Sequence, residues 1–250
     1  MAKKFNEIHE VTFYECDING TMTLPMLLNS VIKTSEAQSE QLQVSTDQLQ
    51  KLGITWVITQ HEMNIHRLPK VGQLIKITTQ GTSYNKYFCY REFWVQDKET
   101  GEQLAHIFST FVLMDLTTRK MISVPDDLLV AFESEKIKRI HRGPHFHQPT
   151  DGAFHQPYRV RFSDIDSNKH VNNAKYLDWM VDCLDYDKLT QYLPQKVWIK
   201  FEKEISYGHT IDSFFSQRLL EEHDQFWTDH EIFVEGNRCA SANILWRKRK

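Results

Sequence analysis

The spacing of apolar residues predicts the same series of elements twice along the chain. In the first half, residues 8–15 alternate between apolar and polar side chains, as in a strand with one covered face. Gly53 is expected to end a helix that occupies residues 23–52. Four segments typical of antiparallel strands follow, at 55–65, 72–84, 86–97 and 102–116. The helix is indicated by apolar residues at the i, i+3, i+4, i+7 and i+8 spacing of one face, namely Leu24, Leu27, Leu28, Val31 and Ile32.

The second half repeats this order. A strand is predicted over residues 157–163 and a helix over residues 172–186. Each half is therefore predicted to contain a strand, a helix and then a run of antiparallel strands, an α+β fold with a sheet wrapped around one helix. The strands predicted after the second helix are at 196–207, 212–222, 225–235 and 238–247.

Matching residues indicate that this repetition is an internal duplication. At a constant offset of 149 residues, "VTFYECDINGTMTLPMLL" aligns with "VRFSDIDSNKHVNNAKYL", so that Asp17 matches Asp166. Thr21 stands where His170 stands in the second copy. Three matches in the same order predict two copies of one domain. The two weaker matches are 55–65 with 197–207 at an offset of 142, which pairs Glu62 with Glu204, and 101–108 with 236–243 at an offset of 135.

The duplication predicts where the domains begin and end. We expect an N-terminal domain over residues 1–132, a linker over 133–155 and a C-terminal domain over 156–250. The linker is charged at first and then rich in Gly, Pro and His, which is typical of a connecting segment. Its histidines do not have the spacing of a metal-binding motif, so we predict no metal site at His141, His145, His147 or His155.

Composition narrows the possible functions. Apolar residues make up 40% of the 250 residues and charged residues 25%, which is ordinary for a globular protein. The formal net charge of −3 gives no reason to expect nucleic acid as a partner. No apolar run is long enough to span a membrane, and "MAKKFNEIHE" lacks the apolar centre of a secretory signal. The four cysteines are far apart without a CxxC pair, so we expect a reducing, cytoplasmic location.

The segment "RFSDIDSNKHVNNAKYLDWM" (161–180) gathers polar residues just ahead of the second predicted helix. One interpretation is structural, with Asp166 capping a turn and Asn172 or Asn173 capping the helix. The other is a hydrolytic site, in which a carboxylate activates water. His170 or the amides of the first helical turn would then stabilise an oxyanion. The spacing of the residues leaves both interpretations open.

"DIDSNKHVNNAKYLDW", followed by "KFEKEIS", resembles the acyl-acyl-carrier-protein thioesterases of bacteria and plant plastids. Members of that family carry an Asp-x-Asn-x-His-Val-Asn-Asn run and, further on, an acidic residue in a Tyr-Arg-Arg-Glu-Cys-like strand. Ile205 stands where plant members often carry Cys. The resemblance implies two tandem hot-dog domains, with an acyl-chain pocket in the N-terminal one. It also implies a catalytic group in the C-terminal one, formed by Asp166, Asn168, His170 and Glu204.

The same resemblance implies a reaction and a partner. The chain would hydrolyse acyl-[acyl-carrier-protein] to free fatty acid and carrier protein, which ends chain elongation, and it would need no cofactor. It would bind an acylated acyl carrier protein and would be a monomer or a homodimer. Two alternatives stay open. The first is an acyl-CoA thioesterase of the hot-dog superfamily, because part of the motif is shared with such enzymes. The second is a non-catalytic acyl-binding protein.

Overall fold

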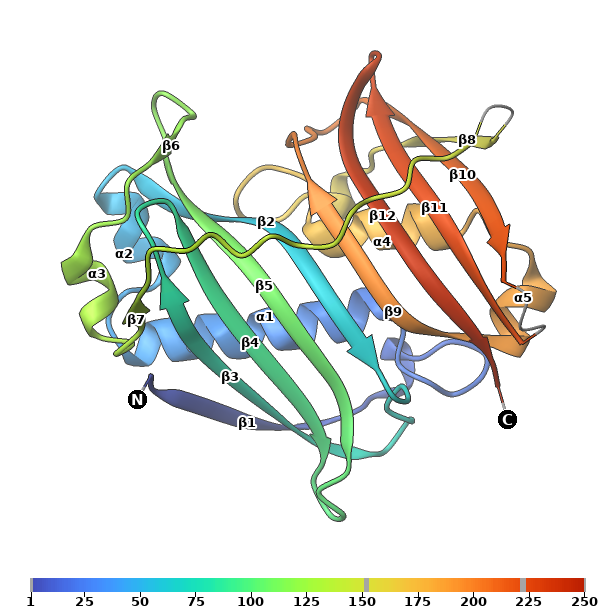
Figure 1. The fold of residues 1–250 in the computed structure, drawn as a ribbon, viewed down its shortest axis with the longest axis horizontal. Coiled ribbons are helices and arrows are strands. Elements are labelled where there is room, and N and C mark those ends of the chain that lie inside the picture. The colour runs from blue at the N-terminus through green and yellow to red at the C-terminus, as the bar shows by residue number, and fades with distance from the viewer. Residues whose placement is uncertain (1, 151–152, 221–223, 250) are drawn as a thin grey trace.

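The computed structural model, which describes residues 2–150, 153–220 and 224–249, contains one continuous sheet with α1 and α4 behind it (Figure 1). The strand order is β1-β3-β4-β5-β2-β9-β12-β11-β10-β8, and neighbours in it are antiparallel. The first half supplies β1 (Lys4–Glu10), β2 (Ile54–Ile65), β3 (Leu74–Tyr84), β4 (Phe88–Asp97) and β5 (Gln103–Asp115). The second half supplies β8 (Phe154–Arg159), β9 (Tyr192–Phe201), β10 (Thr210–Leu219), β11 (Gln225–Val234) and β12 (Asn237–Lys248).

This strand order is the same when read from either edge, once each strand is matched to its counterpart in the other half. The two halves meet in the middle, where β2 pairs with β9. The symmetry agrees with the predicted duplication. Two short strands lie outside the path: β6 (Met121–Ile122) pairs with β5, and β7 (Glu135–Lys136) pairs with β3.

The helices pack on one face of the sheet. The longest is α1 (Leu24–Gln41), and Thr23 caps its start by accepting a hydrogen bond from the Met26 amide. Its counterpart α4 (Asn173–Val181) packs beside it. None of the helices in the described part of the chain is long and apolar enough to cross a membrane. The shorter helices are α2 (Thr46–Lys51), α3 (Asp126–Val130) and α5 (Tyr186–Gln191).

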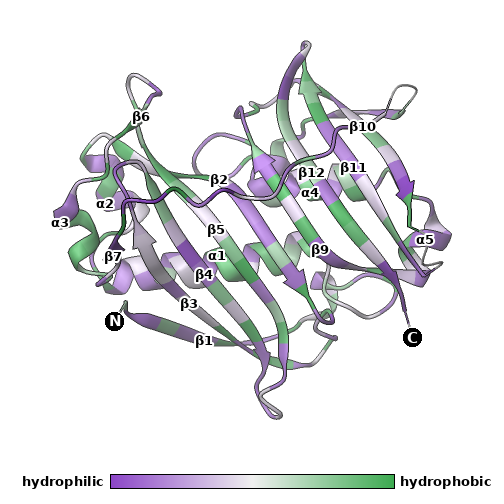
Figure 2. Ribbon diagram, viewed as in Figure 1, coloured by the Kyte–Doolittle hydropathy of each residue, from purple (hydrophilic) through white to green (hydrophobic). Residues whose placement is uncertain are grey.

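One hydrophobic core runs through both halves. It contains Leu27 and Leu28 of α1, Leu177 and Met180 of α4, and Ile199 of β9, all fully buried. Along most strands, apolar residues alternate with polar ones, as Figure 2 shows. The predicted α+β class, with a helix packed on an antiparallel sheet in each half, is therefore confirmed. The exact domain boundaries stay a prediction.

Several predicted elements end earlier than expected. The strands predicted over 8–15 and 157–163 end at Glu10 and Arg159, and the helix predicted over 172–186 ends at Val181. The helix predicted over 23–52 is interrupted after α1, because Gln43 adopts a left-handed φ of 59° and Ser45 starts α2 with its own capping box. The strand predicted over 196–207 ends at Phe201. Glu204 therefore lies in the irregular segment after β9 rather than on a strand.

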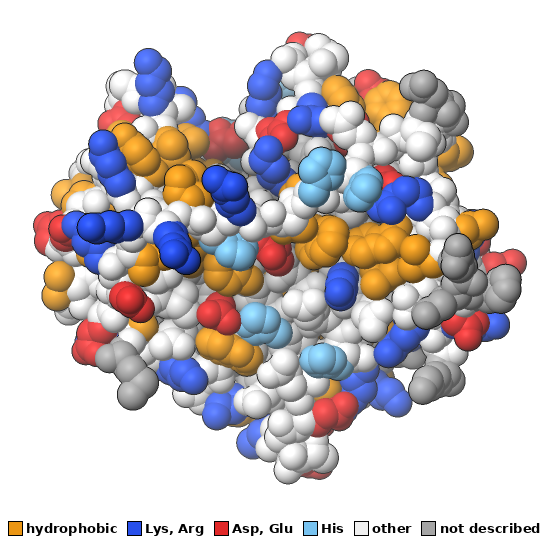
Figure 3. Space-filling view, in the orientation of Figure 1, with side chains coloured by type: hydrophobic (Ala, Val, Ile, Leu, Met, Phe, Trp, Pro, Cys, Tyr) orange, Lys and Arg blue, Asp and Glu red, His pale blue; other side chains and the backbone are white. Residues whose placement is uncertain are grey.

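The described part of the segment predicted to be a linker is held against the sheet, and residues 151–152 of that segment lie outside the described residues. It crosses the face opposite the helices, in front of β2, β5, β9 and β12 (Figure 1), and Figure 3 shows histidines across the middle of this face. His141 packs on Phe108, with ring centroids 4.4 Å apart, and its Nε2 lies 2.9 Å from Glu62 Oε1. Further on, the buried Asn243 side chain accepts a hydrogen bond from the His147 amide (2.9 Å) and donates one to the His147 carbonyl (2.8 Å). We call residues 137–150 the strap.

Candidate active site

The polar segment before α4 forms a tight loop. The Asp166 amide donates to the His170 carbonyl (2.9 Å), and the Lys169 amide donates to the Asp166 carbonyl (3.0 Å). The Asn168 amide donates to Asp166 Oδ1 (2.8 Å). Asp166 thus holds the turn, as the structural interpretation predicts, and the turn presents the His170 side chain at the entrance to α4.

His170 meets Glu204 at this entrance. The Val171 amide donates to the Ile205 carbonyl (2.9 Å), which brings the segment after β9 beside the loop. His170 Nε2 then lies 3.3 Å from Glu204 Oε2. Ile205 is buried, so the position at which plant members carry Cys presents an apolar side chain to the core. The two halves of the sequence motif, 34 positions apart in the chain, are therefore adjacent in space.

Burial shifts the ionisation of the two groups in the loop. It raises the pKa of Asp166 above the ordinary aspartate value, although the Asn168 amide and the charge of His170 act the other way. Burial also lowers the pKa of His170, and the nearby charge of Arg119 lowers it further. A carboxylate with a raised pKa beside a histidine with a lowered pKa is typical of groups that exchange protons near neutral pH.

The asparagines have different roles. Asn172 Oδ1 accepts a hydrogen bond from the Ala174 amide (2.8 Å) and is the N-cap of α4, which confirms the predicted cap, and Asn173 is the first residue of that helix. Asn168 is exposed, and its Oδ1 accepts a hydrogen bond from Gln50 Nε2 (3.2 Å). Gln50 lies on α2, so the N-terminal half reaches into the loop.

Arg119 is a second contribution from the N-terminal half. It lies in the turn between β5 and β6, and its Nη2 contacts Glu204 Oε2. In Figure 1 this turn and the segment after β9 rise on either side of the upper edge of the sheet, and Figure 3 shows a hollow between them. Sequence reasoning missed both Arg119 and Gln50. Neither belongs to the repeated motif, and a lone Arg in "TTRK" has the appearance of an ordinary solvated turn residue.

The first half contains a second loop of the same form. The Asp17 amide donates to the Thr21 carbonyl (2.9 Å) and the Gly20 amide donates to the Asp17 carbonyl (2.9 Å). The Asn19 amide donates to Asp17 Oδ1 (2.9 Å), which repeats the pattern around Asp166 bond for bond. Thr21 replaces the imidazole of the other loop, as the alignment at an offset of 149 predicts.

The hydrogen bonds correct one part of the sequence alignment. The Met22 amide donates to the Pro69 carbonyl (2.8 Å), the equivalent of the bond from Val171 to Ile205. Leu68 therefore occupies the place of Glu204, and the predicted match of Glu62 with Glu204 is wrong by six positions. An apolar cavity of about 290 Å³ opens at this second entrance, between the start of α1 and the residues of α4, α5 and the end of β12.

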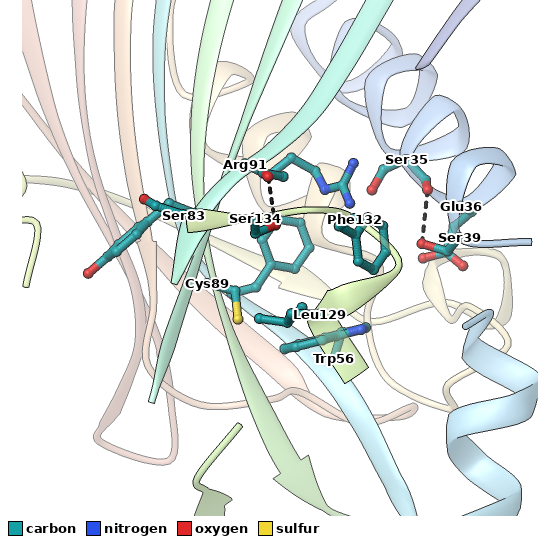
Figure 4. Close-up of a pocket in the computed structure, with 13 residues that line it drawn as sticks. Ser35, Glu36, Ser39, Trp56, Ser83, Cys89, Arg91, Leu129, Phe132 and Ser134 are labelled. Atoms are coloured by element: carbon teal, nitrogen blue, oxygen red, sulfur yellow. Dashed lines mark hydrogen bonds between the residues drawn. The ribbon is translucent and has the colours of Figure 1, made fainter. Parts of the chain in front are cut away.

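A separate cavity lies inside the N-terminal half (Figure 4). Its volume is about 40 Å³, much less than that of the cavity at the second entrance, and it is lined by rings such as Trp56 and Phe132. Arg91 closes one side, and its guanidinium donates to Gln38 Oε1 (2.6 Å) and Thr79 Oγ1 (2.9 Å). Burial lowers the pKa of Arg91 to about 10. Among the described residues, no cluster of three His, Cys, Asp or Glu side chains could hold a metal ion.

Sequence comparison identifies the family. Residues 2–132 match the acyl-ACP thioesterase N-terminal domain, and residues 147–248 match the acyl-ACP thioesterase C-terminal domain. The chain belongs to the acyl-ACP thioesterase family. It is 22% identical, over 258 aligned residues, to the chloroplastic acyl-[acyl-carrier-protein] hydrolase FATB3 of Cuphea viscosissima, with 98% of this chain and 63% of that protein covered. It is 23% identical to the chloroplastic oleoyl-acyl carrier protein thioesterase 1 of Arabidopsis thaliana, with 84% and 62% covered. The chain thus spans less than two thirds of the length of these relatives.

Solved structures of acyl-ACP thioesterases share the fold. A Lactobacillus plantarum protein described as an oleoyl thioesterase is 39% identical to this chain with a TM-score of 0.96, and the match covers 100% of this chain and 98% of that one. The 12:0-ACP thioesterase of Umbellularia californica is 20% identical with a TM-score of 0.86, and 98% and 94% are covered, which shows the fold. The predicted family resemblance and the tandem hot-dog fold are confirmed.

Proposed function

We propose that this member of the family hydrolyses acyl-[acyl-carrier-protein] to a free fatty acid and carrier protein, and so ends fatty acid chain elongation. The observation that carries the proposal is the meeting of His170 and Glu204 at the entrance to α4, beside the Asp166 loop. An acyl-binding protein without activity has no need of this group of side chains. Family membership supports the same reaction.

The geometry supports distinct roles for the four side chains. Glu204 Oε2 already contacts His170 and Arg119, whereas Asp166 has a pKa raised by burial, so Asp166 is the better base. A water held near Asn168 attacks the thioester carbonyl carbon and gives a proton to Asp166. His170 and the amides of the first turn of α4 stabilise the oxyanion. The C–S bond then breaks, and the leaving thiolate takes the proton from Asp166.

The two halves have different tasks in this proposal. The C-terminal domain, residues 156–250, carries the catalytic group. The N-terminal domain, residues 1–132, takes the acyl chain, as the resemblance to the family implies. Because β2 pairs with β9 within one chain, a single chain holds a complete site, whether it is a monomer or part of a homodimer.

Charge and thiol chemistry support the partner and the location. Lys169 and Lys203 are exposed on the segments that carry His170 and Glu204, and cations there favour an acidic carrier. All four cysteines are free thiols, which supports a reducing compartment and the proposed cytoplasmic location.

The test is turnover of acyl carrier protein charged with chains of several lengths, for the variants Asp166→Ala, His170→Ala and Glu204→Ala. Each is expected to lower the rate by about 10²- to 10⁴-fold, because each removes a group that moves a proton or stabilises charge. Free thiol release and fatty acid analysis give the rates, and acyl-CoA in the same assay separates the two carriers.

A matched control is available in the same molecule. Asp17→Ala alters the loop of the first half, which has the same turn but has Thr21 and Leu68 in place of His170 and Glu204. The variant is expected to leave turnover nearly unchanged. Turnover like the parent in all three variants would reject the assignment of the site. A parent protein that hydrolyses neither thioester would reject the proposed function itself.

A further inference from the structure

Arg119 joins the N-terminal half to the catalytic group of the C-terminal half. Its Nη2 contacts Glu204 Oε2, the oxygen that also lies 3.3 Å from His170 Nε2. The side chain of Arg119 is 37% exposed, that of Glu204 35% and that of His170 28%. All three are partly sheltered from water, so their charges interact more strongly than those of a fully solvated pair.

The turn that carries Arg119 is rigidly built. Asp115 Oδ1 accepts hydrogen bonds from the Thr117 amide (3.0 Å), the Thr118 amide (2.7 Å) and the Thr118 hydroxyl (2.9 Å). The Arg119 amide donates to the Asp115 carbonyl (3.0 Å), and Arg119 adopts a φ of 54°, which is uncommon for a residue with a side chain. The guanidinium therefore extends from a fixed base.

The same turn is tied to the other N-terminal contribution. The Leu116 amide donates to the Gly53 carbonyl (2.8 Å), immediately after α2. Gln50 of α2 donates to Asn168 on the catalytic loop. The N-terminal half thus approaches the loop through two connected segments, one that contacts Asn168 and one that contacts Glu204.

The charge of Arg119 also acts on His170. A carboxylate as close as Glu204 favours the protonated imidazole, and a cation beside that carboxylate opposes it. Burial is the larger cause of the lowered pKa of His170, and the charge of Arg119 is the second. Arg119 therefore favours a neutral imidazole that still has Glu204 as its neighbour.

We propose that Arg119 is a positioning residue, a guanidinium lent by the N-terminal half that fixes Glu204 against His170 and makes the site complete only across both halves. The inference rests on the proposed function. Arg119 acts through Glu204 and does not touch the reacting atoms. Lys120, the next residue of the turn, is exposed and makes no ion pair within the described part of the chain, so it is the matched control.

The experiment compares Arg119→Ala, Arg119→Lys and Lys120→Ala in the full chain. Arg119→Ala is expected to lower kcat on acyl-ACP by about 10²-fold while KM stays within about threefold, because a misplaced Glu204 affects the reaction more than binding. Arg119→Lys keeps the charge but not the planar fork, so it is expected to recover only part of kcat. Lys120→Ala is expected to behave like the parent.

A second readout follows His170 directly. The imidazole is titrated by NMR, with its signal assigned by comparison with His170→Asn. Arg119→Ala is expected to raise the pKa of His170, and Arg119→Lys is expected to leave it close to that of the parent. If Arg119 contributed only to folding, the pKa of His170 would be the same in the parent, in Arg119→Ala and in Arg119→Lys.

Three outcomes would overturn the proposal. Arg119→Ala could match Lys120→Ala in both kcat and titration. Arg119→Ala could instead raise KM in a salt-dependent manner at constant kcat, which would make Arg119 a docking residue. If Arg119→Ala does not fold, an unchanged kcat in Arg119→Lys would contradict the need for the fork. A parent without thioesterase activity would reject the proposed function, while the titration would still test the contact with Glu204.

Discussion

Two histidines are fully buried away from the candidate active site. His61 on β2 has Nδ1 2.7 Å from Ser109 Oγ, and His230 on β11 has Nε2 2.8 Å from Thr228 Oγ1. The second ring nitrogen of each has no hydrogen-bond partner among the described residues. Burial lowers the pKa of each to about 3, so both imidazoles are neutral in the folded protein at neutral pH.

The two buried histidines predict that the folded protein loses stability in acid. In the unfolded chain a histidine takes up a proton near pH 6.5, whereas these two do so only near pH 3 when folded. Protonation therefore favours unfolding, and the free energy of unfolding is expected to fall by about 1.4 kcal/mol per histidine for each pH unit below 6.5. Urea unfolding at pH 7 and pH 5.5 measures this.

The comparison that isolates one histidine is His61→Gln, which cannot titrate. Its unfolding free energy is expected to depend less steeply on pH than that of the parent. His145→Gln, an exposed position on the strap, is expected to keep the slope of the parent. Equal slopes for all three proteins would contradict the assignment to buried histidines.

Some residues of the candidate site could be predicted from the sequence and others could not. Asp166, His170 and Glu204 could be predicted because carboxylates and an imidazole stand in a recognisable motif. Arg119 and Gln50 could not, because their proximity to the loop depends on how α2 and the β5–β6 turn pack against the other half. Such contacts between distant segments leave no periodic pattern in the chain.

The start of α4 shows how one element supports the site. Asn172 occupies the N-cap, and its side chain satisfies the Ala174 amide. The Asn172 amide itself donates to the carbonyl of the buried Asp164 (2.9 Å), which fixes the direction in which the loop enters the helix. The cap and the loop are therefore parts of one hydrogen-bonded unit.

Asn172→Ala is expected to lower the free energy of unfolding by about 1 kcal/mol, because it removes the N-cap hydrogen bond. Asn173→Ala, one position later, removes no side-chain hydrogen bond found among the described residues and is expected to change stability by less than half of that. Urea denaturation of both variants measures the difference. A loss for Asn173→Ala equal to that for Asn172→Ala would show that the cap is not the cause.

Elements were predicted better than their ends. The periodic patterns correctly gave α1 and the principal strands of both halves, because burial of one face imposes a period. The ends were missed where a local hydrogen bond prevailed, as at Ser45, which starts a new helix within an apolar pattern. Glu204 was expected on a strand and lies after one, because β9 ends at Phe201.

For the whole molecule, the strap is the feature whose packing composition did not predict. Its Gly, Pro and His residues indicated a connecting segment, and it does run from one half to the other, but composition gave no sign that it packs on the sheet (Figure 1). It is held in the second half by Asn243, which also donates to the buried Asp229 (2.7 Å), and by Ser216 Oγ, which accepts a hydrogen bond from the Thr150 amide (3.2 Å). Because Asn243 is fully buried, its hydrogen bonds to His147 are shielded from water.

Asn243→Ala is expected to release the strap. It leaves the His147 amide and carbonyl without partners, which is expected to cost about 2 kcal/mol of stability. Trypsin is then expected to cleave after Arg142 faster than in the parent, as mass spectrometry of timed digests would show. Ser241→Ala, on the same strand and without a bond to the strap among the described residues, is the control. Equal cleavage rates would mean that the strap is held elsewhere.

The two loops, which share three backbone-donated hydrogen bonds, have a consequence for how this chain can change over time. In an assembly of two identical single-copy chains, every substitution appears at both symmetric positions at once. Here both copies are encoded separately, so Thr21 and Leu68 could replace a histidine and a glutamate without altering the other loop. Selection on the Asp17 loop then needs only to preserve the shape of that loop, whereas selection on the Asp166 loop must preserve both its shape and its reactivity.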